Sequence, residues 1–257
     1  MAVRDLEALL DELADLAAAG AQPGTHVYGS DPEQVADLLM PPADGAHPVA
    51  VLLHGGFWRA RFTKSLMAAL AADLAARGWA TWNVEYRRAG NGGGVPETLD
   101  DVRAALAALH RVPAPLDLAR VVVIGHSAGG QLGLCVADEP VVKAVVSLAG
   151  VCDLAAAFAD GIGQSAVRDF IGAGPQERPD AYRLADPLAR IPAGVPVLLI
   201  HGDADQRVPV RYSRRYVEAA GDARCELLEL AGVDHFALID PRTSAWAQTA
   251  ARLETMR

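Results

Sequence analysis

Ser127 has the sequence surroundings of a catalytic nucleophile. It is the centre of the motif Gly-His-Ser-Ala-Gly at 125–129, which follows the apolar run 121–124 and precedes a stretch with helical spacing. At a tight turn from strand to helix, a serine hydroxyl projects above the sheet edge, and only small residues fit on either side of it. The amides at the start of the helix favour negative charge there. The motif therefore predicts nucleophilic attack by Ser127, and the alternative is a capping serine in a glycine-rich turn.

A serine hydroxyl is a weak nucleophile unless a neighbouring base removes its proton. We expect this base to be His235, because it lies in a loop directly after the last predicted strand. The alternative is a histidine that is bonded only within its own loop. The remaining histidines lie in or beside strands, at the end of a helix or within the serine motif: His26, His47, His54, His110, His126 and His201.

The base in turn needs a carboxylate that holds its tautomer and stabilises the imidazolium. The segment His-Gly-Asp-Ala-Asp at 201–205 follows an apolar run and offers two acids. We favour Asp205, with Asp203 second and Asp153, which follows the preceding strand, third. The resulting order of serine, aspartate and histidine along the chain is the order found in α/β-hydrolases.

The sequence also offers donors for the oxyanion that forms during acyl transfer. The segment His-Gly-Gly-Phe-Trp at 54–58 comes directly after the apolar run 49–53. Adjacent glycines let the backbone approach a substrate closely. We predict an oxyanion hole formed by the amides of Gly56, Phe57 and Ala128, and the alternative is a glycine turn with aromatic packing around it. Three side chains near these positions are predicted to line the substrate pocket: Trp58, His126 and Phe236.

The elements that must position these residues alternate between apolar strands and helices. This alternation predicts an α/β fold, with a sheet of about eight mostly parallel strands and helices on both faces. The predicted strands, of which the first two form an antiparallel hairpin, are 25–29, 34–40, 49–53, 80–86, 120–125, 141–148, 195–200 and 225–230. The predicted helices are 3–19, 63–77, 96–111, 128–138, 210–220 and 241–256.

We predict a single domain over residues 1–257, in which residues 1–20 hold an N-terminal helix. Connections between strands and helices in such sheets are short. Residues 151–194 therefore stand out as an insertion, which we expect to form a small cap over the strand ends and to select the substrate. The run Gly-x-Gly-x-x-Ala at 161–166 does not follow a strand, and this argues against a dinucleotide site.

Four segments together resemble α/β-hydrolases of the esterase and lipase type: HGGFW at 54–58, GHSAGG at 125–130, HGDADQRVP at 201–209 and the Asp-His pair at 234–235. Within this group the chain is most similar to the branch of arylformamidase (kynurenine formamidase)-like proteins and small carboxylesterases. That branch carries His-Gly-Gly-aromatic-Trp and a strand that ends in Tyr-Arg, here Tyr86 and Arg87. The resemblance runs from about residue 25 to the C-terminus. It implies the α/β-hydrolase fold and a Ser-His-Asp hydrolase.

The composition disfavours several classes of protein. There are 32 acidic and 23 basic residues, and the formal net charge of −9 disfavours binding to nucleic acid or to an anionic membrane surface. No apolar run reaches the roughly 20 residues of a membrane span. Cys135, Cys152 and Cys225 have no zinc-site or disulfide spacing. We expect a cytoplasmic protein without metal or cofactor, whose N-terminal helix docks on its own chain or across a homodimer.

The predicted reaction is hydrolysis of a small carboxylic ester through an acyl-enzyme intermediate. One alternative is an arylformamidase that cleaves N-formylkynurenine or a similar small amide. Another is a non-catalytic protein that binds ligands on a hydrolase scaffold, which the retained serine, histidine and aspartate disfavour. Arg87 and Arg88 are expected to be structural, although they would attract an anionic substrate if they faced the pocket.

Overall fold

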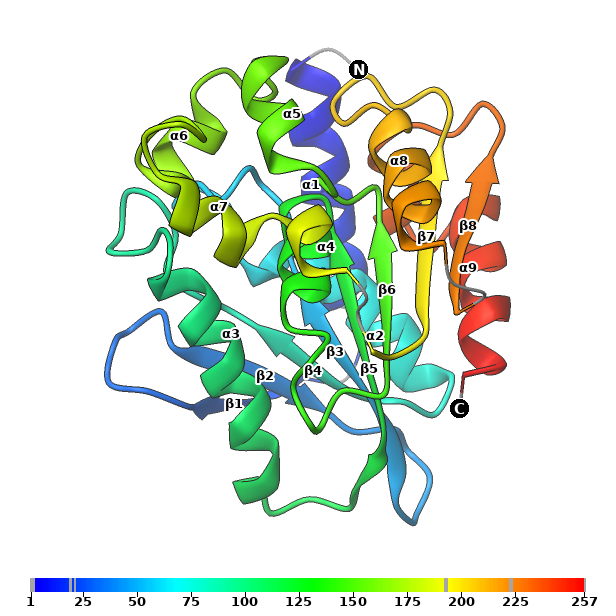
Figure 1. Cartoon of the computed structure of the whole chain (residues 1–257). Helices are drawn as coiled ribbons and strands as arrows, with labels where there is room; N and C mark the ends of the chain where they lie inside the picture. Colours follow the sequence, from blue (N-terminus) through cyan, green and yellow to red (C-terminus); the bar gives the residue numbers. More distant parts are fainter. Residues whose placement is uncertain (1–2, 19, 21, 192–193, 222–223, 257) are drawn as a thin grey trace.

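Eight strands pair into one sheet in the order β1-β2-β4-β3-β5-β6-β7-β8 (Figure 1). The computed structural model describes residues 3–18, 20, 22–191, 194–221 and 224–256. The strands are β1 (Gly24–Val27), β2 (Val35–Leu39), β3 (His47–Leu53), β4 (Ala80–Val84), β5 (Leu116–His126), β6 (Ala144–Leu148), β7 (Val197–Gly202) and β8 (Cys225–Leu230).

The sheet is parallel from β4 to β8, as the sequence predicts. Within the described residues, antiparallel pairing occurs in the hairpin of β1 with β2 and in the contact of β2 with β4. The predicted N-terminal hairpin is therefore confirmed. A parallel sheet is buried on both faces, which explains why β3 is buried at every position rather than at alternate ones.

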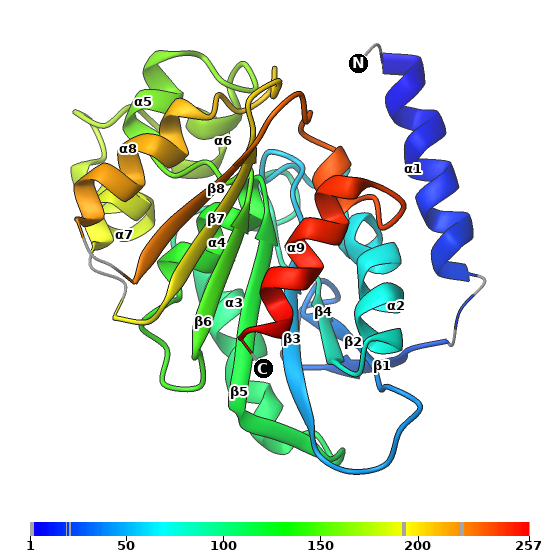
Figure 2. The ribbon, with the colours of Figure 1, turned by 90° about the vertical axis from the view of Figure 1, so that its right-hand side faces the viewer.

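Helices cover both faces of the sheet (Figure 2). Successive residues of a strand point to opposite faces, so Leu52 belongs to the core under one set of helices and Leu53 to the core under the other. The set on the Leu52 side is α2 (Ala68–Ala76) and α9 (Ser244–Glu254). The set on the Leu53 side is α3 (Glu97–Ala108), α4 (Ala128–Cys135) and α8 (Arg211–Ala220).

The N-terminal helix α1 (Val3–Ala18) packs on the outside of α2 (Figure 2). Leu13 is buried in the core that α2 shares. Glu12 forms an ion pair with Arg242, in which Oε2 and Nη1 are 2.8 Å apart. In the structure this helix therefore docks on its own chain. The helix predicted over 3–19 extends to Ala18, and residue 19 lies outside the described residues.

Between β6 and β7 the chain leaves the sheet over the predicted insertion. We call residues 151–191 the cap segment, since residues 192 and 193 lie outside the described residues. The cap segment contains α5 (Leu154–Ala159), α6 (Ala166–Ile171), α7 (Pro179–Ala185) and the 3₁₀ turn η3 (Pro187–Arg190). These helices are short, because glycines and prolines interrupt the segment.

Several elements differ in extent from the prediction, such as β6, which begins at Ala144 rather than at residue 141. The helix predicted over 63–77 begins as the 3₁₀ turn η1 (Lys64–Met67), which Thr63 caps, before α2 starts. Strand β5 begins four residues early, because its first two residues pair with the first two of β3 across a register shift. The helix predicted over 128–138 ends at Cys135. No helix in the described ranges is long and apolar enough to cross a lipid bilayer.

Candidate active site

Ser127 lies at the turn between β5 and α4, in a backbone conformation that few residues adopt. Its φ of 55° and ψ of −114° lie outside the main allowed regions for a residue with a side chain. A Cβ at Gly125 would lie 2.1 Å from Gly129 O, and a Cβ at Gly129 would lie 2.0 Å from Leu53 O. The two glycines of the motif are therefore sterically required for this turn.

His235 and Asp205 contact each other near this turn, and His235 lines the same cavity as Ser127. Asp205 follows β7 and His235 follows β8, so both residues leave the sheet at the edge where Ser127 lies. His235 Nδ1 is 2.6 Å from Asp205 Oδ2. A carboxylate only accepts hydrogen bonds, so Nδ1 carries a hydrogen, and in the neutral form of the ring Nε2 is the nitrogen with the lone pair. Among the described residues, Ser127 Oγ makes no hydrogen bond to this ring, a contact that in hydrolases often tightens only when substrate is bound.

Asp205 is held by donors on several sides. The amides of Arg207 and Val208 donate to Oδ1 at 2.8 and 2.9 Å. His201 Nε2 lies 3.3 Å from Oδ2. Burial alone would raise the pKa of Asp205, but hydrogen bonds from His201 and His235 outweigh it and hold this pKa well below its usual range. The carboxylate is therefore charged at neutral pH.

His201, which the sequence analysis set aside as a base, supports Asp205 from the end of β7. Its Nε2 also lies 2.8 Å from Val208 O, and its Nδ1 lies 2.7 Å from the Ser213 hydroxyl. Both neighbours of Nε2 are acceptors, so Nε2 carries the hydrogen and Nδ1 accepts from Ser213. The signal in the sequence is a histidine four residues before the acid, at the end of the same strand.

The two other candidate acids lie elsewhere. Asp203 is exposed and accepts a hydrogen bond from the Gly232 amide at 2.6 Å. Asp153 caps α5, with Ala156 N donating at 2.8 Å, and it also pairs with Arg215. Neither carboxylate bonds to a histidine in the part of the chain that the structure describes.

The three amides predicted to form an oxyanion hole donate to no acceptor among the described residues. Gly56 and Phe57 line a cavity above Ser127, and Ala128 is the first residue of α4, directly after the serine. A Cβ at Gly56 would lie 2.3 Å from the Phe62 Cβ, so this position requires glycine. Unpaired amides at a helix start and in a glycine turn are available to a negatively charged oxygen.

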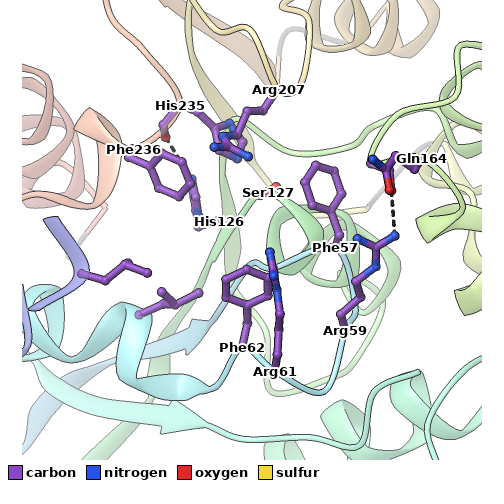
Figure 3. A pocket seen from close by; sticks show the side chains of 14 residues that line it. Phe57, Arg59, Arg61, Phe62, His126, Ser127, Gln164, Arg207, His235 and Phe236 are labelled. Carbon is purple, nitrogen blue, oxygen red and sulfur yellow. Dashed lines mark hydrogen bonds between the residues drawn. The ribbon is translucent and has the colours of Figure 1, made fainter. Parts of the chain in front are cut away.

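This cavity has a volume of about 340 Å³ (Figure 3). Ser127 and His235 both line it, which brings the predicted nucleophile and base to one space. Its apolar walls come from α1, from the chain after β3 and from the loop after β8: Leu10, Phe57, Phe62, Leu66 and Phe236. A space of this size and lining is typical of sites for small molecules.

His126 and Phe236, two residues predicted to line the pocket, lie in this cavity and flank His235. His126 Nε2 is 3.0 Å from the backbone oxygen of His235. The Phe236 ring meets the His235 ring edge-on, with centroids 5.2 Å apart. Burial and, next, the neighbouring His235 lower the pKa of His126 to about 3. His126 is therefore neutral at pH 7, and its Nε2 hydrogen bonds to the His235 loop.

Trp58 does not belong to the described lining of the cavity, and its assignment to the pocket is wrong. The residue is 1% exposed, and its ring stacks on Phe170 with centroids 4.7 Å apart. Its Nε1 donates to Gln131 Oε1 at 2.8 Å, and Gln131 donates to Ala185 O at 2.7 Å. Because Phe170 and Ala185 belong to the cap segment, Trp58 joins the chain after β3 to the cap.

The cap segment itself contributes little to the cavity. Of the described residues that line the space, only Gly163 and Gln164 come from it. Residues 56–62, which follow β3, contribute more of the wall, as Figure 3 shows for Phe57, Arg61 and Phe62. The lining therefore does not support the expectation that the cap segment is the main determinant of substrate choice.

A second group of paired polar side chains, which we call the buried cluster, consists of His54, Glu85, Arg88 and Glu33 near the ends of β3 and β4. His54 is 0% exposed, its Nδ1 lies 2.7 Å from Gly55 O, and its Nε2 lies 2.9 Å from Glu85 Oε1. The Gly55 oxygen only accepts, so Nδ1 carries the hydrogen of the ring, and burial keeps this ring neutral by lowering the pKa of His54 to about 3. Arg88 forms ion pairs with Glu85 and Glu33.

Arg87 and Arg88 therefore have structural roles. Arg87 donates to the two carboxylate oxygens of Asp101 at 2.9 and 2.7 Å. Arg88 is buried among the carboxylates of the cluster. Neither residue is among the described residues of the cavity wall, so neither is available to an anionic substrate there.

A sequence model of the BD-FAE family matches residues 36–219, which is more than half of the chain. The chain belongs to the BD-FAE family. The matched span of this BD-FAE protein runs from β2 into α8 and includes the turn at Ser127 and the loop of Asp205, while His235 follows it.

This BD-FAE protein is also similar to two individual proteins. It is 30% identical over 247 residues to Esterase LipC of Mycobacterium tuberculosis (strain ATCC 25618 / H37Rv), across 83% of this chain and 60% of LipC. The chain thus spans about 60% of the length of that relative. It is 28% identical over 200 residues to the uncharacterized peptidase YtmA of Bacillus subtilis (strain 168), across 74% of this chain and 76% of YtmA.

Solved structures confirm the α/β-hydrolase fold. A truncated carbohydrate esterase from gut microbiota matches with a TM-score of 0.78 at 21% identity, over 93% of this chain and 98% of that one. The esterase Est2 of the Planctomycetes species Thermogutta terrifontis matches with a TM-score of 0.73 at 22% identity, over 91% of each chain.

Proposed function

We propose that this BD-FAE protein is a serine esterase that hydrolyses small carboxylic esters through an acyl-enzyme on Ser127. The observation that carries the proposal is the 2.6 Å contact of His235 with Asp205 beside a cavity that His235 shares with Ser127. The names of Esterase LipC and of two structural neighbours support an ester as the substrate. The activity of the whole protein is part of this proposal.

In the first half of the reaction, Ser127 Oγ attacks the ester carbonyl carbon while its proton passes to His235 Nε2. The imidazolium that forms is stabilised by the charged Asp205, whose hydrogen bond also fixes the ring orientation. The carbonyl oxygen becomes an oxyanion, and the unpaired amides of Gly56, Phe57 and Ala128 would stabilise it. The bond to the alcohol oxygen then breaks, and His235 returns the proton to the leaving alcohol.

In the second half, water attacks the carbonyl carbon of the acyl-Ser127 intermediate. His235 Nε2 takes a proton from this water, and the same amides would bind the second oxyanion. Collapse of the intermediate breaks the bond to Ser127 Oγ, which regains the proton from His235. The sum of the two halves is one ester and one water converted to one acid and one alcohol.

The same groups would also cleave a small activated amide such as an N-formyl group. The arylformamidase alternative therefore stays a prediction, since the attacked atom is again a carbonyl carbon and the leaving group again needs a proton. The preference between ester and formamide is a difference in rate, which a direct comparison of the two substrates measures.

The test is hydrolysis of p-nitrophenyl acetate, butyrate and octanoate beside N-formylkynurenine, by the wild-type protein and by Ser127→Ala. We expect the short esters to be cleaved fastest, because the cavity of about 340 Å³ is small, and Ser127→Ala to be inactive. A formamide rate that exceeds the ester rates by orders of magnitude would establish the arylformamidase instead. If the folded wild type cleaves none of the four substrates, the esterase proposal is wrong and the non-catalytic alternative holds.

A further inference from the structure

The cavity at Ser127 has a positive wall in an acidic protein. Its described lining includes Arg59, Arg61 and Arg207 and no aspartate or glutamate. The chain as a whole has a formal net charge of −9. A cleft lined by charges of one sign focuses the local potential and concentrates ligands of the opposite sign. The positive charge of the cavity wall therefore favours an anionic ligand, although the net charge of the whole chain is negative.

Two of these arginines are free to bind such a ligand. In the described ranges, neither Arg61 nor Arg207 forms an ion pair with a carboxylate. Each guanidinium lies over an aromatic ring, with Arg61 Cζ 4.4 Å from the centre of Phe62 and Arg207 Cζ 5.1 Å from the centre of Phe236. Stacking on a ring orients a guanidinium and leaves its N–H groups on the edge free to donate.

Arg59 differs from these two residues. Its Nη2 donates to Gly163 O at 2.8 Å, and the same atom lies 3.8 Å from the Asp169 carboxylate. Both partners belong to the cap segment, so Arg59 joins the chain after β3 to the cap. The unpaired positive charge of the cavity wall is therefore that of Arg61 and Arg207.

The two free arginines lie on different sides of the serine. Figure 3 shows Ser127 between Arg207, which is close to His235, and Arg61, which is close to Phe62. An ester bound at Ser127 extends in two directions, toward its acyl group and toward its alcohol. Arginines on different sides of the serine would serve an anion on either part of the ester, because a guanidinium matches a carboxylate or a phosphate with two parallel hydrogen bonds.

We propose that the substrates are small esters that carry a carboxylate or phosphate group, and that Arg61 and Arg207 bind this anion. The inference rests on the proposed esterase function and adds the chemical class of the substrate. Arg207 is half-buried and Arg61 is exposed. Because exposed charges are more strongly screened, Arg207 makes the larger contribution.

The test compares anionic esters with neutral partners of similar size. On the alcohol side, the substrates are 4-acetoxybenzoate, 4-acetoxyphenyl phosphate and the neutral methyl 4-acetoxybenzoate. On the acyl side, they are p-nitrophenyl hemiglutarate and the neutral p-nitrophenyl pentanoate. The measured quantity is the ratio of kcat/KM for the anionic ester to kcat/KM for its neutral partner. The two anionic substrates of the alcohol side distinguish binding of a carboxylate from binding of a phosphate. Comparison of the two substrate sets shows whether the anion is bound on the acyl side or on the alcohol side.

The variants are Arg207→Gln, Arg61→Gln and the double variant. We expect the double variant to lower the ratio about 10- to 100-fold for at least one anionic ester, the effect of losing one or two hydrogen bonds to a charged group. Most of this change should be in KM, and Arg207→Lys should restore part of it. Raising the salt concentration should lower the wild-type ratio for the same ester.

Arg183→Gln is the matched control, because it removes one exposed guanidinium on α7 that is not among the described residues of the cavity wall. It should leave every ratio as in the wild type. The proposal is overturned if the double variant changes no ratio more than this control does, while neutral esters are still hydrolysed. Absence of hydrolysis of both neutral and anionic esters by the folded wild type would instead contradict the esterase function itself.

Discussion

Two histidine–carboxylate pairs lie near the same edge of the sheet and differ in access. His235 and Asp205, 2.6 Å apart, lie at the cavity that contains Ser127. His54 and Glu85, 2.9 Å apart, are enclosed behind the chain that follows β3, and His54 is 0% exposed. In the first pair Nδ1 contacts the carboxylate, and no described residue bonds to Nε2 beside the cavity. In the second pair Nε2 contacts the carboxylate and Nδ1 bonds to Gly55 O, so both nitrogens are used inside the fold.

The remaining contacts of each carboxylate explain the difference further. Asp205 is held by backbone amides and by His201, and no residue in the described ranges hydrogen bonds to His235 Nε2. Glu85 also accepts from Arg88 and from the Lys64 amide, so its contacts complete a buried network. A histidine–carboxylate pair is therefore a candidate catalyst where the ring keeps one nitrogen for a ligand, and a structural pair where both nitrogens are used inside the fold.

The largest effect is expected from removing the nucleophile or the base. Ser127→Ala or His235→Ala should lower kcat for ester hydrolysis by about 10⁴–10⁶, the range for knockouts of catalytic triads. His54→Asn, in the enclosed pair, should lower kcat by less and stability by more. Steady-state kinetics and urea unfolding of the three variants measure both quantities. Equal losses of kcat in the two pairs would remove the distinction between them.

The second effect concerns the acid. Asp205→Asn should lower kcat by about 10⁴, because an amide favours the wrong tautomer of His235 and cannot stabilise its positive charge. Asp203→Asn is the matched control, since this exposed carboxylate bonds to the Gly232 amide instead. Wild-type kinetics of Asp205→Asn together with an inactive Asp203→Asn would reverse our choice of acid.

The third effect is on stability. Glu85→Gln leaves Arg88 and His54 without their shared buried carboxylate, and breaking a buried pair costs about 3–5 kcal/mol. The free energy of unfolding in urea should fall by this amount, whereas folded Glu85→Gln should lose less activity than Asp205→Asn. A variant as stable as the wild type but inactive in ester hydrolysis would place Glu85 in the catalytic machinery.

The smallest effect is the pH dependence that the neutral His126 adds to stability. Its pKa is about 3 in the folded protein and roughly 6.5 in the unfolded chain. The contribution of neutral His126 to the free energy of unfolding is therefore complete above about pH 6.5, and it is lost as the pH falls toward 3. Between pH 7 and pH 5 the loss is about 2 kcal/mol.

Urea unfolding at these two pH values measures the effect of His126. The drop in the free energy of unfolding should be smaller by that amount in His126→Gln. A drop of equal size in the variant and the wild type would show that His126 is not the source.

The turn around Ser127 was predictable because its causes are local. The steric limits on Gly125 and Gly129 come from backbone atoms of the turn and of the adjacent strand, so the motif carries them in the sequence. The strands and their parallel order follow equally from apolar runs that alternate with helices. Chain order does not separate Asp205 from Asp203, which lies two residues earlier, and the structure brings Asp205 to His235.

The cavity wall was harder to predict, because it depends on contacts between distant segments. Leu10 reaches the cavity only because α1 docks on α2, and Trp58 is withdrawn from it by Phe170 and Gln131. The arginines illustrate the same limit. Arg88 pairs with Glu85, three residues earlier, and also with Glu33, 55 residues earlier, and the sequence contains no local sign of the second pairing.

Labelling with a fluorophosphonate probe, followed by mass spectrometry of the peptides, shows directly whether Ser127 is an activated nucleophile. The probe reacts with a serine only when a base activates it, so it reports the nucleophile without any assumption about the natural substrate. We expect one adduct, on Ser127, which is absent in Ser127→Ala and much slower to form in His235→Ala. An adduct on another residue, or an unlabelled Ser127 in folded wild-type protein, would contradict this expectation.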